Sequence, residues 1–309
     1  MRQNTPILVI DRDTGTEFEE VILGEGYIRW AYQDSTSSLV ERLLFRSKFF
    51  SKIMGFWYDS PLSRGKIAPA IKALAIDESE FLKPRSSYRS FNDFFIRRLK
   101  PEARPYSKDD RDIVSPADGR VLVFPRLDED TFVPVKGFPF SIHKMLPGLS
   151  DRYVNGALAI IRLCPADYHR YHFPCAGRIS DSKDIDGALH SVNPIALGSG
   201  PDVFGENKRS YTLIETDTAG MICFVEVGAF GVGSIVDTVS SDLVNKMDEK
   251  GYFKFGGSTV VLVFEQGKID FSQDLIDNSA LGKETLVKVG QTIAKVSEHE
   301  AERAAARSR

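Results

Sequence analysis

The feature that most constrains the fold is a series of short apolar runs, rich in β-branched residues, that lies beyond about residue 106. These runs occupy residues 113–114, 121–124, 157–163, 211–215, 221–227, 234–236 and 259–264. Runs of this length, separated by Gly, Pro, Asn and Asp, are typical of strands joined by turns. We therefore predict that residues 106–309 form a mainly antiparallel, sandwich-like β-sheet domain.

Two turn patterns within the chain predict hairpins. The segments 6–11 and 17–23 flank Asp13-Thr14-Gly15, and the runs 113–114 and 121–124 flank Ser115-Pro116-Ala117-Asp118-Gly119. Glycine and Asp-Gly supply the backbone conformations that tight turns need. We expect each pair of segments to form two adjacent strands.

The chain before residue 106 has a different, helical pattern. In residues 38–57 apolar side chains recur at spacings of 3, 4 and 7, and shorter helical segments follow at 66–76 and 91–99. Ser90 and Asp93 are suited to cap the last of these. Residues 1–105 are therefore predicted to be a hairpin and helices, which makes the whole chain α+β.

The segment 38–57 has two interpretations. It carries four cations against one acid, with Phe49, Phe50 and Trp57 among its apolar residues. A basic helix of this kind can lie in a membrane interface. The same apolar stripe is also what a helix needs in order to pack onto a domain core. The sequence leaves both interpretations open.

Composition excludes several classes of protein. The net charge of −3 argues against a nucleic-acid partner. The three cysteines show no paired spacing, so we expect neither a disulfide framework nor a zinc site, and a reducing compartment fits. We see no apolar run of transmembrane length and no secretory signal.

The first candidate for chemistry is Ser258, which follows Gly256-Gly257 and begins a predicted strand. A hydroxyl at such a corner is sterically open to act as a nucleophile. A glycine turn before an ordinary strand explains the same residues.

The second candidate is the pair His169 and His172, directly after the run 157–163. Two imidazoles at a strand end could share acid–base work, and no further ligands complete a metal site. Asp118 is either a turn residue or the carboxylate that orients a histidine. With Ser258 and one histidine it would make a Ser-His-Asp set.

Several motifs in this order resemble those of the phosphatidylserine decarboxylases, over about residues 25–290. They are Phe94-Phe95-x-Arg97, Ser115-Pro116-Ala117-Asp118-Gly119, Asp167-Tyr168-His169-Arg170-Tyr171-His172, Ser191-Val192-Asn193-Pro194 and Gly257-Ser258-Thr259. Many members have Leu-Gly-Ser-Thr at the last motif. The Gly256-Gly257-Ser258-Thr259 of this chain resembles a second subgroup and retains the glycine and serine.

The resemblance implies that the chain cuts itself between Gly257 and Ser258, into fragments 1–257 and 258–309. Ser258 attacks the Gly257 carbonyl, with His172 as its base and Asp118 behind it. Ser258 then becomes a pyruvoyl group, which serves as the electron sink for decarboxylation, so neither a metal nor a diffusible cofactor is expected. His169 assists decarboxylation or the protonation that follows it.

The resemblance also implies a substrate and a location. Phosphatidylserine would be converted to phosphatidylethanolamine and CO₂ by a homodimer that lies peripherally on the cytoplasmic side of a membrane. Phe94, Phe95 and His190 are candidate substrate-pocket residues, and Phe49, Phe50 and Trp57 are candidate membrane contacts. Three alternatives stay open: a decarboxylase of a soluble aromatic amino acid, a serine hydrolase that uses Ser258, His172 and Asp118, and a non-catalytic β-sandwich binding module.

Overall fold

The computed structural model describes residues 7–20, 48–127, 140–188, 190, 202–229, 235–256 and 258–298. Gly257 and the predicted helical segment from residue 38 to residue 47 lie outside these ranges, as does the motif 191–194.

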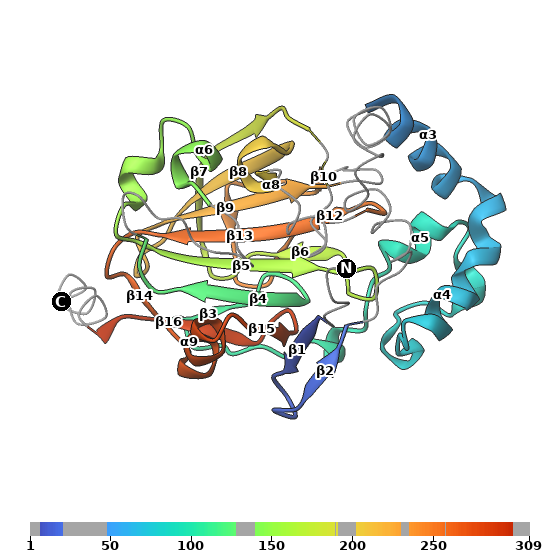
Figure 1. Ribbon diagram of the computed structural model, residues 1–309, viewed down its shortest axis with the longest axis horizontal. Coiled ribbons are helices and arrows are strands. Elements are labelled where there is room, and N and C mark those ends of the chain that lie inside the picture. Colours follow the sequence, from blue (N-terminus) through green and yellow to red (C-terminus); the bar gives the residue numbers. More distant parts are fainter. Residues whose placement is uncertain are drawn as a thin grey trace, which may run out of the picture.

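The centre of the molecule is a ten-stranded sheet (Figure 1). All its described pairings are antiparallel except that of β1 with β15. The prediction of a mainly antiparallel α+β fold is therefore confirmed. In spatial order the strands are β11 (Leu243–Val244), β7 (Gly177–Ile185), β8 (Arg209–Glu215), β9 (Met221–Gly228), β13 (Ser258–Phe264), β5 (Ala157–Leu163), β4 (Gly119–Phe124), β15 (Glu284–Val287), β1 (Leu8–Asp11) and β2 (Glu17–Glu19).

Strands β5 and β13 are apolar almost throughout because both faces of the sheet are covered. Ile161 and Val260 point to one face, whereas Ile160 and Val261 point to the other. Two three-stranded sheets pack on the first face and give the fold its sandwich-like character. They are β10 (Ile235–Asp237), β12 (Glu249–Phe253) and β6 (Arg170–His172), and β14 (Ile269–Phe271), β16 (Thr292–Val296) and β3 (Asp112–Val114).

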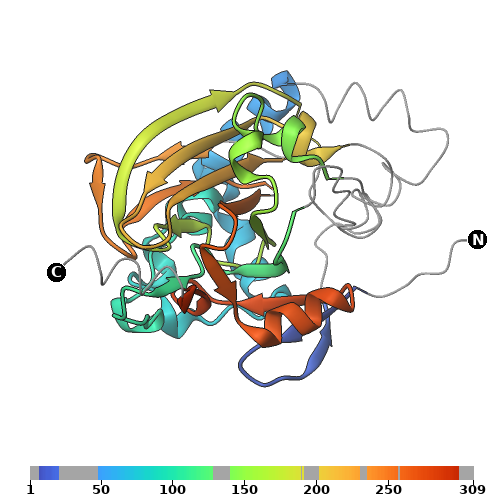
Figure 2. The same cartoon turned by 90° about the vertical axis from the view of Figure 1, so that its left-hand side faces the viewer.

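The second face is covered by short helices, α6 (Ile142–Met145), η5 (Ser150–Tyr153) and α8 (Val203–Glu206), whose buried residues join its hydrophobic cluster. Helix α9 (Gln273–Ala280) packs against β4 and β15. The β1–β2 hairpin lies beside α9 (Figure 2), where Arg12 donates to the Asp274 carboxylate at 2.7 Å.

The N-terminal helices lie at the end of the sheet where β13 begins (Figure 1). They form a hydrophobic cluster of their own, which includes Tyr58, Phe91 and Phe95 and which Phe255 joins. The helical elements of this region are α3 (Lys48–Asp59), η1 (Pro61–Lys66), α4 (Ile67–Ala73), η2 (Glu78–Glu80), η3 (Arg85–Ser87), α5 (Phe91–Phe95) and η4 (Pro101–Ala103).

Helix boundaries differ in part from the prediction. Helix α3 ends at Asp59, two residues beyond the end of the predicted segment 38–57. Ser90 accepts from the Asp93 N–H at 3.1 Å, as a cap should, but α5 ends at Phe95 rather than at residue 99. Leu99 instead forms a β-bridge with Phe81. The apolar spacing in this segment serves packing of its rings rather than a longer helix.

One predicted hairpin is confirmed and the other is wrong. Strands β1 and β2 pair antiparallel around Gly15, which adopts φ +69°. Strands β3 and β4 do not pair with each other: β3 pairs with β16, and β4 pairs with β5 and β15. The link from residue 115 to residue 118 carries the chain from one sheet to the other, because each strand finds a better partner far away in sequence. No helix in the described part of the chain is long and apolar enough to cross a membrane.

Candidate active site

Ser258 is the first residue of β13, at the centre of the large sheet. It lies opposite Leu163 of β5 and Gly228 of β9 and is fully buried. Its hydroxyl oxygen has no hydrogen-bond partner among the described residues. A buried hydroxyl without a partner is costly to keep, and such sites are often functional.

His169 presents a second buried group of the same kind. Its Nδ1 lies 3.0 Å from the carbonyl oxygen of Asp167, its ring packs on Phe95 at 3.8 Å between centroids, and its Nε2 has no described partner. Burial lowers the pKa of His169 to about 3. The imidazole is therefore neutral at pH 7. With Nδ1 donating to the carbonyl, Nε2 is left as a bare acceptor.

The loop that carries His169 is anchored by Asp167. Its buried carboxylate accepts from the Cys164 N–H at 2.6 Å and forms an ion pair with Arg120 of β4. Arg120 in turn pairs with Glu20 at 2.7 Å. The His169 carbonyl accepts from the Phe253 N–H at 2.9 Å, so His169 lies beside the segment that leads to Ser258.

His172 lies at the end of β6, and extended backbone separates it from His169. Its Nδ1 is 3.0 Å from the Met247 carbonyl oxygen, and its Nε2 is 3.3 Å from the Tyr168 hydroxyl. Burial lowers the pKa of His172, while the Met247 carbonyl and the carboxylates of Glu249 and Asp118 oppose this shift. The two histidines thus have separate surroundings.

Asp118 lies at the switch between sheets. Its carboxylate accepts two hydrogen bonds from Arg104, at 3.0 and 2.6 Å, and one from the Val289 N–H at 2.7 Å. It acts on His172 through its charge, and His172 donates its backbone N–H to Pro116, two residues before Asp118. No side-chain hydrogen bond joins Asp118 to His172 in the described structure, so the predicted Ser-His-Asp set stays a prediction.

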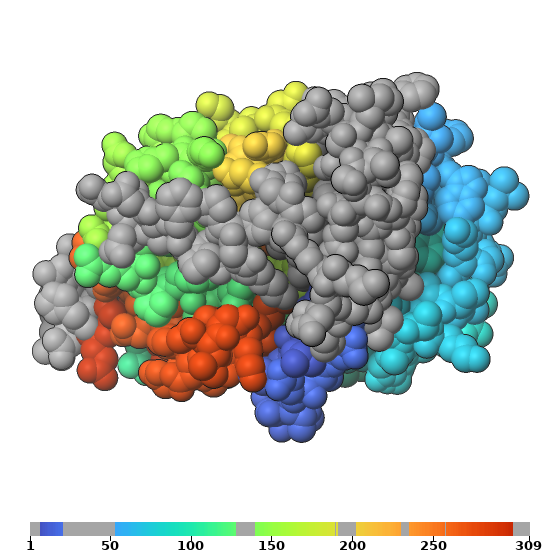
Figure 3. Space-filling model, in the orientation of Figure 1, coloured from blue at the N-terminus to red at the C-terminus, as the bar shows by residue number. Residues whose placement is uncertain are grey.

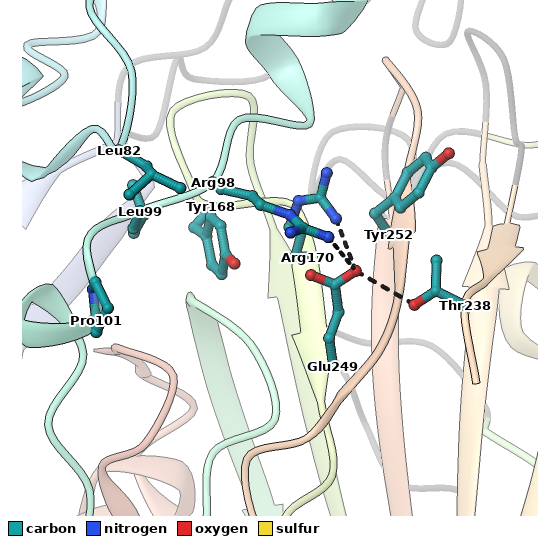
Figure 4. A pocket seen from close by; sticks show the side chains of 9 residues that line it. All are labelled: Leu82, Arg98, Leu99, Pro101, Tyr168, Arg170, Thr238, Glu249 and Tyr252. Atoms are coloured by element: carbon teal, nitrogen blue, oxygen red, sulfur yellow. Dashed lines mark hydrogen bonds and ion pairs between the residues drawn. The ribbon is translucent and has the colours of Figure 1, made fainter. Parts of the chain in front are cut away.

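Tyr168 borders two pockets whose walls are formed by described residues. One, of about 280 Å³, is lined by Arg97, Arg104 and Asp118. The other, of about 640 Å³, is shown in Figure 4, where Arg98, Arg170 and Thr238 converge on the Glu249 carboxylate. Arg170 donates to Glu249 at 2.7 Å. These pockets bring solvent-accessible space to the residues that surround His172.

The other predicted site residues are placed as follows. Phe94, Phe95 and His190 are almost fully buried. Trp57 is half-buried. Its ring centroid lies 4.9 Å from that of Tyr58 in an edge-to-face arrangement, and the Lys66 ammonium lies 4.6 Å from the Trp57 centroid. Phe49 and Phe50 lie in α3, but their side chains are outside the description, as is Gly257. Among the described residues, no group of three or more His, Cys, Asp or Glu side chains is arranged to hold a metal ion.

Sequence reasoning missed three contributors to the site. Arg104 binds Asp118, Arg120 anchors the His169 loop, and Asn92 binds the chain just before Ser258. Arg120 directly follows the Asp118-Gly119 turn, and Asn92 lies two residues before the Phe94-Phe95-x-Arg97 motif. Their proximity to motifs was a usable signal, whereas nothing around Arg104 marks it.

Known proteins resemble this chain over most of its length. The family model described as Phosphatidylserine decarboxylase matches residues 91–295. The "Phosphatidylserine decarboxylase proenzyme" of Clostridium beijerinckii is 42% identical over 290 residues, which cover 93% of this chain and 98% of the relative. The proteins of the same name from Clostridium perfringens strain SM101 and Clostridium botulinum strain Kyoto are each 41% identical and cover 93% and 92% of this chain, and 99% and 97% of their own length.

These matches first define the class: the chain is a carboxy-lyase, an enzyme that releases CO₂. More particularly, the chain belongs to the phosphatidylserine decarboxylase family.

Proposed function

We propose that the protein is made as a proenzyme, cuts itself between Gly257 and Ser258, and then converts phosphatidylserine to phosphatidylethanolamine and CO₂. The observation that carries the proposal is the buried Ser258 hydroxyl, which has no described hydrogen-bond partner and begins a central strand directly after two glycines. Family membership and the printed name "proenzyme" of the relatives support it.

Self-cleavage needs only groups of this chain. The Ser258 hydroxyl loses its proton to a base and attacks the Gly257 carbonyl, which moves the acyl group from nitrogen to oxygen. Elimination then breaks the new ester and releases the Gly257 carboxylate. Water replaces the nitrogen of residue 258, which leaves as ammonia. We assign the base to His172, with Asp118 supplying the negative charge that favours its protonated form.

The site suits the pyruvoyl group that this cleavage would leave at residue 258. Ser258 is fully buried between β5 and β9, so a ketone formed there would be shielded from bulk water. When present, the group supplies a carbonyl that takes up the substrate amine and accepts the electron pair freed as CO₂ leaves. We assign proton return to His169: its Nε2, which has no partner among the described residues, can take up a proton that the substrate ammonium loses on joining the ketone and then give it to the α-carbon.

Contact with a lipid surface is the second part of the proposal. Phe56 and Leu62 are 82% and 83% exposed, and Ile53, one helical turn before Phe56, is 50% exposed. Arg64 and Lys66, both exposed, follow Leu62. These residues belong to α3 and η1 at one end of the molecule (Figure 3). Apolar side chains flanked by cations suit an anionic bilayer surface.

A peripheral position on the cytoplasmic side of a membrane and a homodimeric state complete the proposal, both by resemblance to the family.

The proposal is tested by comparing candidate substrates, each given to the protein separately. Purified protein is given phosphatidylserine in vesicles, free serine, or a free aromatic amino acid, and released CO₂ is measured. We expect CO₂ only from the lipid, with phosphatidylethanolamine as the product. Release from the aromatic amino acid instead would contradict the lipid assignment, and hydrolysis of ester substrates without CO₂ would favour a serine hydrolase.

A further inference from the structure

The chain is fastened to the N-terminal helices three residues before Ser258. The Phe255 N–H donates to Oδ1 of Asn92 at 2.8 Å, and Nδ2 of Asn92 donates to the Asp59 carboxylate at 3.0 Å. The Lys254 ammonium donates to the other Asp59 oxygen, also at 3.0 Å. Asn92 is 1% exposed, so its amide is committed to these two bonds.

The ring of Phe255 also contacts the N-terminal helices. It lies among the rings of Tyr58, Phe95 and Phe91, with centroid separations of 4.1, 5.1 and 5.2 Å. Phe95 also packs against the His169 ring. The same aromatic pocket therefore touches the segment before the cleavage site and a predicted catalytic histidine. We call Asp59, Asn92 and the rings of Tyr58, Phe91 and Phe95 the Asn92 clamp.

The other side of the cleavage site is fixed by the sheet. Ser258 pairs with β5 and β9, so only Gly256 and Gly257 connect it to Phe255. Gly256 adopts φ +152°, a conformation that side-chain-bearing residues rarely take. Two residues span at most roughly 7 Å when extended. A tether this short limits where the peptide bond before Ser258 can lie relative to the clamp.

We propose that the Asn92 clamp positions the Gly257 carbonyl for attack by Ser258, and that Asn92 is the positioning residue at its centre. The proposal rests on the self-cleavage proposed above. Intramolecular attack is sensitive to placement, and an error of about 1 Å can cost on the order of 100-fold in rate. Because Tyr58 and Asp59 form the last turn of α3, the clamp also joins the proposed lipid-contacting helix to the cleavage site.

The clamp has a second consequence once the bond is cut. The new carboxyl end at Gly257 would lie within roughly 7 Å of Phe255, since the chain is still anchored there. The clamp thus keeps the end of the long fragment beside the site instead of releasing it to solvent.

The test uses the donor and acceptor pattern of Asn92. In N92D a carboxylate still accepts from the Phe255 N–H but opposes the Asp59 carboxylate instead of donating to it. We expect self-cleavage, followed as appearance of the 52-residue fragment by intact mass, to slow by about 10- to 100-fold. Adding D59N restores a donor opposite the new carboxylate, and the double variant should recover to within about threefold of wild type.

A matched control lies on the same helix. S90A removes the α5 cap, a hydrogen bond of 3.1 Å to Asp93, without touching the clamp, and should cut at the wild-type rate. Melting of each variant in an S258A background, which is expected to stay uncut, separates loss of folding from loss of rate.

The outcomes are distinct. The clamp would be overturned if N92D is cut at the wild-type rate, or if adding D59N to N92D restores no cleavage rate. Slowing of cleavage by S90A as large as that by N92D would overturn it as well. Wild-type protein that is never cut would instead overturn the proposed function itself.

Discussion

At the residue scale the most informative side chain is His169. Its ring is buried and neutral, and its Nε2 has no hydrogen-bond partner among the described residues. Its folded-state pKa of about 3 lies below the ordinary histidine value of 6.5 because burial penalises the charged ring. The unfolded chain therefore binds more protons than the folded one between these two values. Stability contributed by the neutral ring is fully present above pH 6.5 and is lost as pH falls toward 3.

Replacing His169 should remove this pH dependence. In an S258A background, we expect H169Q to reduce the loss of unfolding free energy between pH 7 and pH 5 by about 2 kcal/mol. Urea unfolding at the two pH values measures it. An unchanged loss would mean that His169 is protonated, or accessible to water, in the folded protein.

In the wild-type background H169A should still be cut but should fail to turn over substrate, and full turnover would contradict the role assigned to His169.

Asp118 poses a question that two variants answer together. D118N removes the charge proposed to act on His172 and leaves the largely buried Arg104 with the Glu80 carboxylate as its remaining described ion-pair partner. R104Q breaks the same ion pair but keeps the carboxylate. We expect D118N to remain uncut and R104Q to be cut within about tenfold of the wild-type rate. Equal loss in both would mean that Asp118 serves only to hold Arg104 and Val289.

At the scale of elements, the sequence predicted single strands well and their partners poorly. Residues 157–163 and 259–264 are almost wholly apolar, and both are strands within one residue of the prediction. The β3–β4 hairpin was wrong because turn residues also occur where a chain passes between sheets. Pairing depends on contacts between distant segments, which a local pattern does not record.

The predictability of the site follows the same division. Ser258, His169 and Asp118 stood out because reactive side chains occurred next to strand ends and turns. Asn92 and Arg104 did not, because an amide and a guanidinium are common surface groups until folding buries them against specific partners. Residues that hold others in place carry no chemical signature of their own.

The exposed apolar residues of α3 and η1 give an element-scale prediction. F56S with L62S should weaken flotation with anionic vesicles by about tenfold or more, because each apolar side chain gains roughly 1.5–3 kcal/mol in an apolar phase. L243S with L281S is the matched control, since both leucines are exposed but lie elsewhere, Leu243 in β11 and Leu281 directly after α9. Equal loss in both pairs, or no vesicle binding at all, would contradict this surface.

At the scale of the whole molecule, cleavage should not separate the two fragments. The short fragment would contribute β13 to the centre of the large sheet, between β5 and β9 of the long fragment, and β16 to a small sheet beside β3. We expect both fragments to co-elute in gel filtration under native conditions and to separate only in denaturant. Separation in native buffer would contradict this expectation, because β13 would then have left its place between β5 and β9.

The central claim is that the enzyme becomes active when Ser258 is converted to a pyruvoyl group. Intact mass spectrometry tests this claim most directly. Active protein should contain a long fragment ending at Gly257 and a 52-residue fragment that is lighter by one ammonia than its sequence, whereas S258A should give one uncut chain without activity. Full activity from an uncut wild-type chain, or a short fragment with an unmodified serine at its start, would contradict the account.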